Sequence, residues 1–235
     1  MRRWRQGVLG ILIGGCAVSV ALADPPSVWP QIVRPWLTRD ARPAATPTEA
    51  IKALDATLSG YHTGADITPE QREENRRIKE RVVRGTFDLR ELSRIALGKH
   101  WTVLADAQRN QFVDLMIDLL EHKGVLSKEQ GQKNTRRGAV YSIQYRGDKF
   151  LDPLRRRALA RTAVTVPSRN LRVGLDYKLH AVGSEWKIYD VIVDGSSLLE
   201  NYQYQFDSII TKHGFGELLA RMQRKRDEFA AEHEK

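Results

Sequence analysis

Hydrophobic residues in the first half of the chain recur every three or four positions, the spacing expected of amphipathic helices. Three of these runs begin with a capping box, in which an N-cap side chain and the side chain three residues later bind each other's backbone N–H groups. Proline stands at the first helical position in two of them. We therefore expect helices at about residues 47–59, 69–84 and 89–97, opened by Thr46 with Glu49, Thr68 with Gln71 and Asp88 with Glu91.

A fourth run, Asp106 to Lys123, is apolar over most of its circumference. Within its apolar part, only Asp114 and Asp118, four residues apart, form a narrow polar stripe. Such a helix must be surrounded on nearly every side, because exposed apolar surface is unfavourable in water. Two interpretations stay open at this point: a central core helix, or a helix that lines an enclosed cavity.

The hydrophobic period changes from 3.6 to 2 after Val140, which indicates β-strands. Arg146–Asp148 is predicted to form a turn, and the other strands are joined by short links, so neighbouring strands should pair antiparallel. The result is a four-stranded meander with one dry face and one wet face. The strands are expected at about residues 141–145, 158–166, 171–179 and 186–193.

Helical spacing returns after the sheet, first from Leu198 to a stop at Gly214 and then from Phe215 until the chain becomes charged at Arg224. Helices, then strands, then helices is the order of an α+β fold. We predict a four-stranded antiparallel sheet covered by about six helices. The single domain should span residues 46–235, with helical parts at 46–123 and 196–232 on either side of a sheet at 139–194.

The N-terminus has the pattern of an export signal. Three arginines lie in residues 2–5, no further charge occurs before Asp24, and the apolar run ends in Ala21-Leu22-Ala23, a typical cleavage site. We expect cleavage near Ala23 and a periplasmic protein that begins with a proline-rich extended arm, residues 24–45. An uncleaved anchor and lipidation of Cys16 are the alternatives.

Cleavage would leave 35 basic and 29 acidic side chains, a net charge of +6, and no cysteine. No nucleic-acid-binding signature is present, so we expect no nucleic acid as a partner. Anionic lipid surfaces or acidic proteins fit an exported basic protein better. Two basic groups could meet lipid phosphates or acidic partners, or could be solvated strand ends: Arg136 with Arg137, and Arg155, Arg156 and Arg157 with Arg161.

Catalytic and metal-binding patterns are missing from the sequence. The six histidines are scattered, with no pair at a metal-ligand spacing. Asp194-Gly195-Ser196-Ser197 lacks the second glycine of a nucleophile elbow, and a helix N-cap explains its serines better. We expect a protein that is not an enzyme and that needs no metal and no cofactor.

Three stretches of the chain form a set: Phe87–Arg94 continuing through 97–101 to 108–112, then Val173–Leu179 with Trp186–Leu198, and Asn201–Tyr202 with Gln205–Phe206 and Ile209–Ile210. Together they resemble the MlaC-type family of periplasmic lipid carriers, also known for toluene tolerance and lipid asymmetry. The middle stretch is the most specific, and the resemblance covers about residues 46–222 in order. The arm before Thr46 and the segment 123–137 depart from the family pattern.

The resemblance implies a carrier that shields the acyl chains of a phospholipid and moves it between an inner-membrane ABC transporter with its MCE-type partner and an outer-membrane lipoprotein–porin complex. A hopanoid-like lipid, or an envelope adaptor protein with a filled core, are the alternatives. A carrier needs apolar walls around a cavity. The predicted lipid-binding residues are Phe112, Leu115, Met116, Leu119, Leu120, Tyr141, Ile143, Val164, Val166, Val173, Leu175, Tyr177, Leu179, Leu199, Tyr202 and Phe206.

Overall fold

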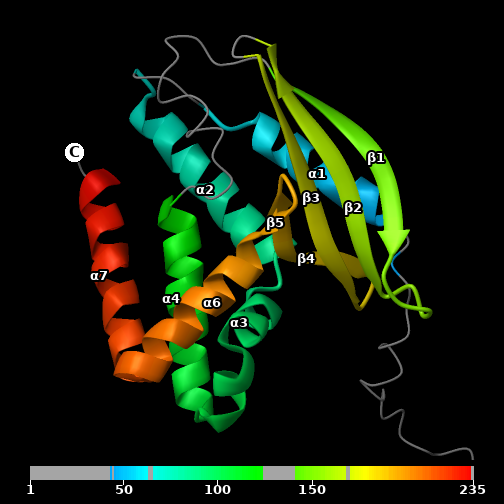
Figure 1. Ribbon diagram of the computed structural model, residues 1–235. Helices are drawn as coiled ribbons and strands as arrows, with labels where there is room; N and C mark the ends of the chain where they lie inside the picture. The colour runs from blue at the N-terminus through cyan, green and yellow to red at the C-terminus, as the bar shows by residue number, and fades with distance from the viewer. Residues whose placement is uncertain (1–42, 44, 63–65, 124–140, 168–169, 234–235) are drawn as a thin grey trace, which may run out of the picture. The chain divides into compact units, whose positions relative to one another are not determined.

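The first three helices of the domain (Figure 1) begin at their predicted N-caps, Thr46, Thr68 and Asp88. The side chains of Thr46 and Thr68 each accept a hydrogen bond from the backbone N–H three residues later. The side chains at those later positions, Glu49 and Gln71, accept in turn from the backbone N–H of the threonine, so both capping boxes are confirmed. The helices are α1 (Pro47–Ser59), α2 (Pro69–Thr86), α3 (Leu89–Leu97) and α4 (Asp106–Lys123), with a 3-10 helix, η2 (Gly98–Val103), after α3.

This computed structural model describes residues 43, 45–62, 66–123, 141–167 and 170–233. All of them belong to one compact unit, Leu37–Lys235. Several predicted features lie outside the described residues. They are the signal peptide with Cys16, nearly all of the proline-rich arm, and residues 124–137, which include Arg136 and Arg137.

The third capping box forms only by half. The Asp88 carboxylate accepts a hydrogen bond from the Glu91 N–H at 2.9 Å, as an N-cap does. The N–H of Asp88, however, donates to the carbonyl of Ile188 at 2.9 Å. Because this donor is already satisfied by the sheet, the Glu91 carboxylate is free to pair with Arg94 at 2.7 Å.

The antiparallel meander is confirmed, but the sheet has five strands where four were predicted. The extra strand arises because Asp194 and Gly195 both have positive φ, 47° and 84°, the geometry of a type I′ hairpin turn. This turn folds Ser196 and Ser197 back onto Ile192 and Val193. The strands, in sheet order, are β1 (Ser142–Phe150), β2 (Arg157–Val166), β3 (Leu171–Val182), β4 (Glu185–Val193) and β5 (Ser196–Ser197).

The predicted turn at Arg146–Asp148 is wrong, because β1 runs through it. The pairing with β2 shifts between Tyr145 and Asp148, and Gly147 has a φ of 82°. These are the marks of a β-bulge, which inserts a residue without ending the strand. The chain instead turns after Phe150, at residues 151–156.

Two apolar clusters fill the domain. The sheet cluster joins α1 and α2 to one face of the sheet, where strand register places Ala158, Ala160, Tyr177 and Leu179 together. The helical cluster joins α3 and α4 to the last two helices, α6 (Leu198–His213) and α7 (Phe215–His233). In Figure 1, α4, α6 and α7 accordingly stand together beside the sheet, and α1 lies against the strands.

The other face of the sheet is wet only in part. Arg146, Lys149 and Arg161 are exposed there on β1 and β2, as the predicted alternation requires. On β4 the same face is covered, because Asp190 is buried and its carboxylate receives the N–H of Leu199 at the start of α6. Helices therefore approach the sheet on both sides of the β4 edge.

Helix α4 is enclosed along only part of its length. Phe112, Leu115 and Met116 are buried, whereas Leu119 and Leu120 near its C-terminal end are half-buried. The all-round apolar pattern thus predicted the buried section of the helix but not its more open end.

Candidate functional site

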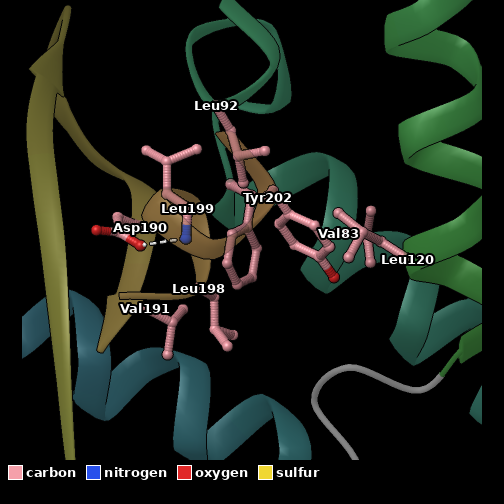
Figure 2. Close-up of a pocket in the computed structure, with 9 residues that line it drawn as sticks. Val83, Leu92, Leu120, Asp190, Val191, Leu198, Leu199 and Tyr202 are labelled. Atoms are coloured by element: carbon pink, nitrogen blue, oxygen red, sulfur yellow. Dashed lines mark hydrogen bonds between the residues drawn. The ribbon is translucent and has the colours of Figure 1, made fainter. Parts of the chain in front are cut away.

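A pocket lies where the helical cluster and the sheet cluster meet, at the β4 edge of the sheet (Figure 2). Phe87, at the end of α2, belongs to the border of both clusters and pairs its backbone with Ile188 of β4 in a parallel bridge. The pocket is lined by Val83, Phe87, Leu92, Leu120, Asp190, Val191, Leu198, Leu199 and Tyr202.

The pocket walls come from four helices and one strand and are almost wholly apolar. Its volume is about 40 Å³. An apolar cavity of about 150 Å³ holds benzene, and pockets for drug-sized ligands measure about 300–1,000 Å³. An acyl chain therefore enters this pocket only if the walls move apart. The border between two separately packed clusters is where such movement breaks the fewest contacts inside either cluster.

Asp190 is one of the lining residues, but only 1% of its surface is exposed, so its carboxylate is turned away from the pocket and into the protein. Its carboxylate accepts a hydrogen bond from the Leu199 N–H at 3.1 Å, which Figure 2 shows as a dashed line. It also accepts from the Ser197 hydroxyl at 2.8 Å and lies 2.9 Å from the Lys178 ammonium. A buried charge needs this degree of compensation. The network fastens the first turn of α6 to β4, so Asp190 has a positioning role.

The contact with Asp190 also changes the pKa of Lys178. Burial on its own would lower the pKa of its ammonium, but the hydrogen bond that the ammonium donates to Asp190 and the negative charges of Asp190 and Glu200 outweigh burial and raise the pKa. Lys178 is thus held protonated beside the buried side chain of Asp190.

Ser197 is an N-cap, as predicted. Its hydroxyl oxygen accepts from the Glu200 N–H at 3.0 Å while its hydrogen goes to Asp190. Among the residues that the structure describes, no histidine is hydrogen-bonded to Ser197. The hydroxyl thus donates one hydrogen bond and accepts another, and both hold the start of α6.

Tyr202 places a hydroxyl among apolar side chains. Figure 2 shows its ring pointing from α6 toward Val83 and Leu120. Burial raises the pKa of Tyr202, and its ring stacks on Phe206 with centroids 5.6 Å apart. In the part of the chain that the structure describes, no hydrogen bond joins this hydroxyl to another residue, and the side chain adds mainly apolar surface to the pocket.

The structure spreads the sixteen predicted lipid-binding residues over four places. Leu120, Leu199 and Tyr202 line the pocket. Phe112, Leu115, Met116, Leu119 and Phe206 lie in or against the helical cluster, and Leu175, Tyr177 and Leu179 lie in or against the sheet cluster, under α1 and α2. Tyr141, Ile143, Val164, Val166 and Val173 are half-buried on the same sheet face, and the hydroxyl of Tyr141 donates to Asp55 at 2.9 Å.

Sequence reasoning missed six lining residues: Val83, Phe87, Leu92, Asp190, Val191 and Leu198. Two of them, Phe87 and Leu92, carry the hydrophobic-staple pattern around the N-cap of α3, which explains local helix entry but not the cavity. The strand Trp186–Val193 is mostly apolar and carries only two charged residues, Lys187 and Asp190. Asp190 is its one acidic residue. A lone acid in a buried strand was the signal that could have marked this edge.

The described residues contain no group of three His, Cys, Asp or Glu side chains placed to hold a metal ion. Nor does any helix in these ranges have the length and apolar character needed to cross a membrane.

The chain is similar to known proteins in fold and in family sequence pattern. No curated protein matches it in sequence. A solved structure with the same fold is that of a phospholipid-binding protein from Ralstonia solanacearum in complex with a phospholipid; it is 22% identical, with a TM-score of 0.62 over 79% of this chain and 99% of that one. The model of the MlaC protein family matches residues 52–224, most of the chain. The protein therefore belongs to the MlaC family.

Proposed function

We propose that this protein is a periplasmic phospholipid carrier that shelters acyl chains in an enlarged form of the pocket between α2, α4, β4 and α6. The observation that carries the proposal is an almost wholly apolar pocket at the border of two core clusters, in a chain of the MlaC family. The similar fold of the Ralstonia protein, which was solved with a phospholipid, supports it.

The energetics define what the pocket must do. Exposing one methylene to water costs about 0.8 kcal/mol, so a sixteen-carbon tail costs on the order of 10 kcal/mol. A carrier must bury nearly all of each tail to leave a membrane. The side chains of Val83, Phe87, Leu120 and Leu198 supply apolar walls from α2, α4 and α6.

The path of the lipid is part of the proposal. The export pattern of residues 1–23 and the family membership support a periplasmic protein. It would exchange lipid with an inner-membrane ABC transporter carrying an MCE-type protein and with an outer-membrane lipoprotein–porin complex. No covalent chemistry is required, so the protein acts as a carrier and not as an enzyme.

Native mass spectrometry of protein purified without detergent tests the proposal. We expect a bound phospholipid, and we expect Leu120→Trp to lower its occupancy about tenfold, because overpacking a cavity costs about 1–3 kcal/mol. Leu119→Trp is the matched control, since Leu119 is the neighbouring residue of α4 and does not line the pocket. Protein that is consistently free of lipid, or equal occupancy in both variants, would refute this site.

A further inference from the structure

Exposed aliphatic side chains gather at one end of the sheet. The structure describes six large apolar residues as exposed, and three of them lie here: Leu154 at 67%, Leu151 at 44% and Val182 at 43%. The β1–β2 and β3–β4 connections share this end because the strands are antiparallel, and the Ala181 N–H donates to the Arg156 carbonyl at 2.8 Å. We call Leu151, Leu154 and Val182, together with the basic residues Lys149 and Arg155, the sheet tip.

The loop that carries Leu154 has an ordered internal structure. The Asp152 carboxylate accepts hydrogen bonds from the N–H groups of Arg156 at 2.8 Å and Arg157 at 3.1 Å, and its carbonyl accepts from Arg155 at 3.1 Å. Arg155 has a φ of 55°, a left-handed conformation that side-chain-bearing residues adopt at some cost. These hydrogen bonds fix the loop backbone, so Leu154 is held in an exposed position by an ordered loop.

Positive charge accompanies the aliphatic residues. Residues 149–157 contain four basic side chains and one acidic side chain, Asp152. The Asp152 carboxylate accepts hydrogen bonds from backbone N–H groups of its own loop. Lys149 and Arg155 are exposed, and the Arg155 guanidinium lies 4.1 Å from the centre of the Phe150 ring, which orients it. Arg157 in contrast pairs with Glu91 of α3.

We propose that the sheet tip docks the protein on an anionic phospholipid bilayer, with Leu154, Leu151 and Val182 in the headgroup region and Lys149 and Arg155 on lipid phosphates. Binding of this kind grows with buried apolar area and with attraction to anionic lipid. A stable protein interface buries about 800 Å² on each partner, more than three side chains on a projecting turn supply, whereas a lipid surface deforms around a small tip. In Figure 1 the turn extends beyond the arrowhead of β1.

A fluorophore at the tip tests the proposal in the full chain. Leu154→Cys, labelled with an NBD dye in a Cys16→Ser background, is mixed with vesicles of phosphatidylethanolamine and phosphatidylglycerol at 3:1. We expect a blue shift and an intensity rise of about threefold as the dye enters the interface. Val103→Cys is the matched control, because Val103 is 79% exposed on η2, away from the tip, and should not respond.

Charge reversal supplies the second measurement. Lys149→Glu with Arg155→Glu should weaken vesicle binding of the labelled chain about 25-fold, from about fivefold for each cation. An unchanged dye at position 154, an equal response at position 103, or an equal response to pure phosphatidylcholine would overturn the proposal. The readout is local to the tip and independent of the lipid in the pocket, so its failure differs from that of the carrier function.

Discussion

The hydroxyl of Ser197 donates to the carboxylate of Asp190 at 2.8 Å, and this bond joins the cap of α6 to the edge of the sheet. The same carboxylate neutralises Lys178, so one buried residue secures both a helix start and a cation. Asp190 therefore ties the first turn of α6 to β4, and we expect the pocket to open at the apolar walls that α2 and α4 supply.

Asp190→Ala should lower the free energy of unfolding by about 3 kcal/mol, because it leaves the Lys178 charge partly buried without a partner. Ser197→Ala should cost about 1 kcal/mol, the usual value of an N-cap side chain. Urea unfolding measures both. The double variant should lose less than the sum, since the two residues share a bond. Additive losses would contradict the shared network.

Tyr202→Phe should raise the stability of lipid-free protein by up to about 1 kcal/mol, because it removes a hydroxyl from an apolar pocket. Tyr141→Phe is the matched control with the opposite sign: it should cost about 1 kcal/mol, since the Tyr141 hydroxyl donates to Asp55. Thermal or urea unfolding of both variants checks this. If Tyr202→Phe destabilises the lipid-free protein as Tyr141→Phe does, the Tyr202 hydroxyl has a partner.

Asp88 should contribute to acid stability. The hydrogen bond from His180, at 3.0 Å, holds the pKa of the Asp88 carboxyl below its usual range. A lowered folded-state pKa gives stability that is complete above the unfolded pKa of about 4 and is lost as pH falls through the folded value. Asp88→Asn keeps a good N-cap but removes this charge. Its unfolding free energy should therefore depend less on pH below about pH 4, as acid titration followed by circular dichroism would show.

The turn that creates β5 depends on Gly195. Gly195→Ala should cost about 1–2 kcal/mol, because an L residue is strained at a φ of 84° although no atom lies within 4 Å of the new Cβ. Gly85→Ala, also with free space but inside α2, should instead stabilise by about 0.5–1 kcal/mol. Chemical unfolding of the two variants compares them. A loss at both positions would mean that crowding, and not backbone conformation, sets the effect.

Much of the fold was readable because its causes are local. Thr46 and Thr68 mark helix starts through contacts three residues away, and the alternation in β3 reports its own two faces. The errors arose where local patterns have two outcomes. Glycine with polar neighbours at residues 146–148 suits a turn or a bulge equally. Asp194-Gly195, in contrast, is a residue pair typical of a two-residue hairpin turn, and it accounts for the fifth strand.

The candidate site was predictable only in part. Leu120, Leu199 and Tyr202 were identified because their helices have apolar faces, but the β3 wall expected opposite them packs with α1 and α2 instead. An apolar face shows that a residue will be covered and does not say by which element. The pairing of Phe87 with Ile188, separated by about a hundred residues, decides which helix reaches the sheet edge.

The sequence by itself determined the helix ends, the strand alternation and the α+β order, since each depends on neighbours within a few residues. Only the tertiary structure decided where the two apolar clusters meet, what neutralises Asp190, and which leucines remain outside at the sheet tip. Those outcomes depend on contacts between segments far apart in the chain, and hydrophobic burial has no direction that a single segment could encode.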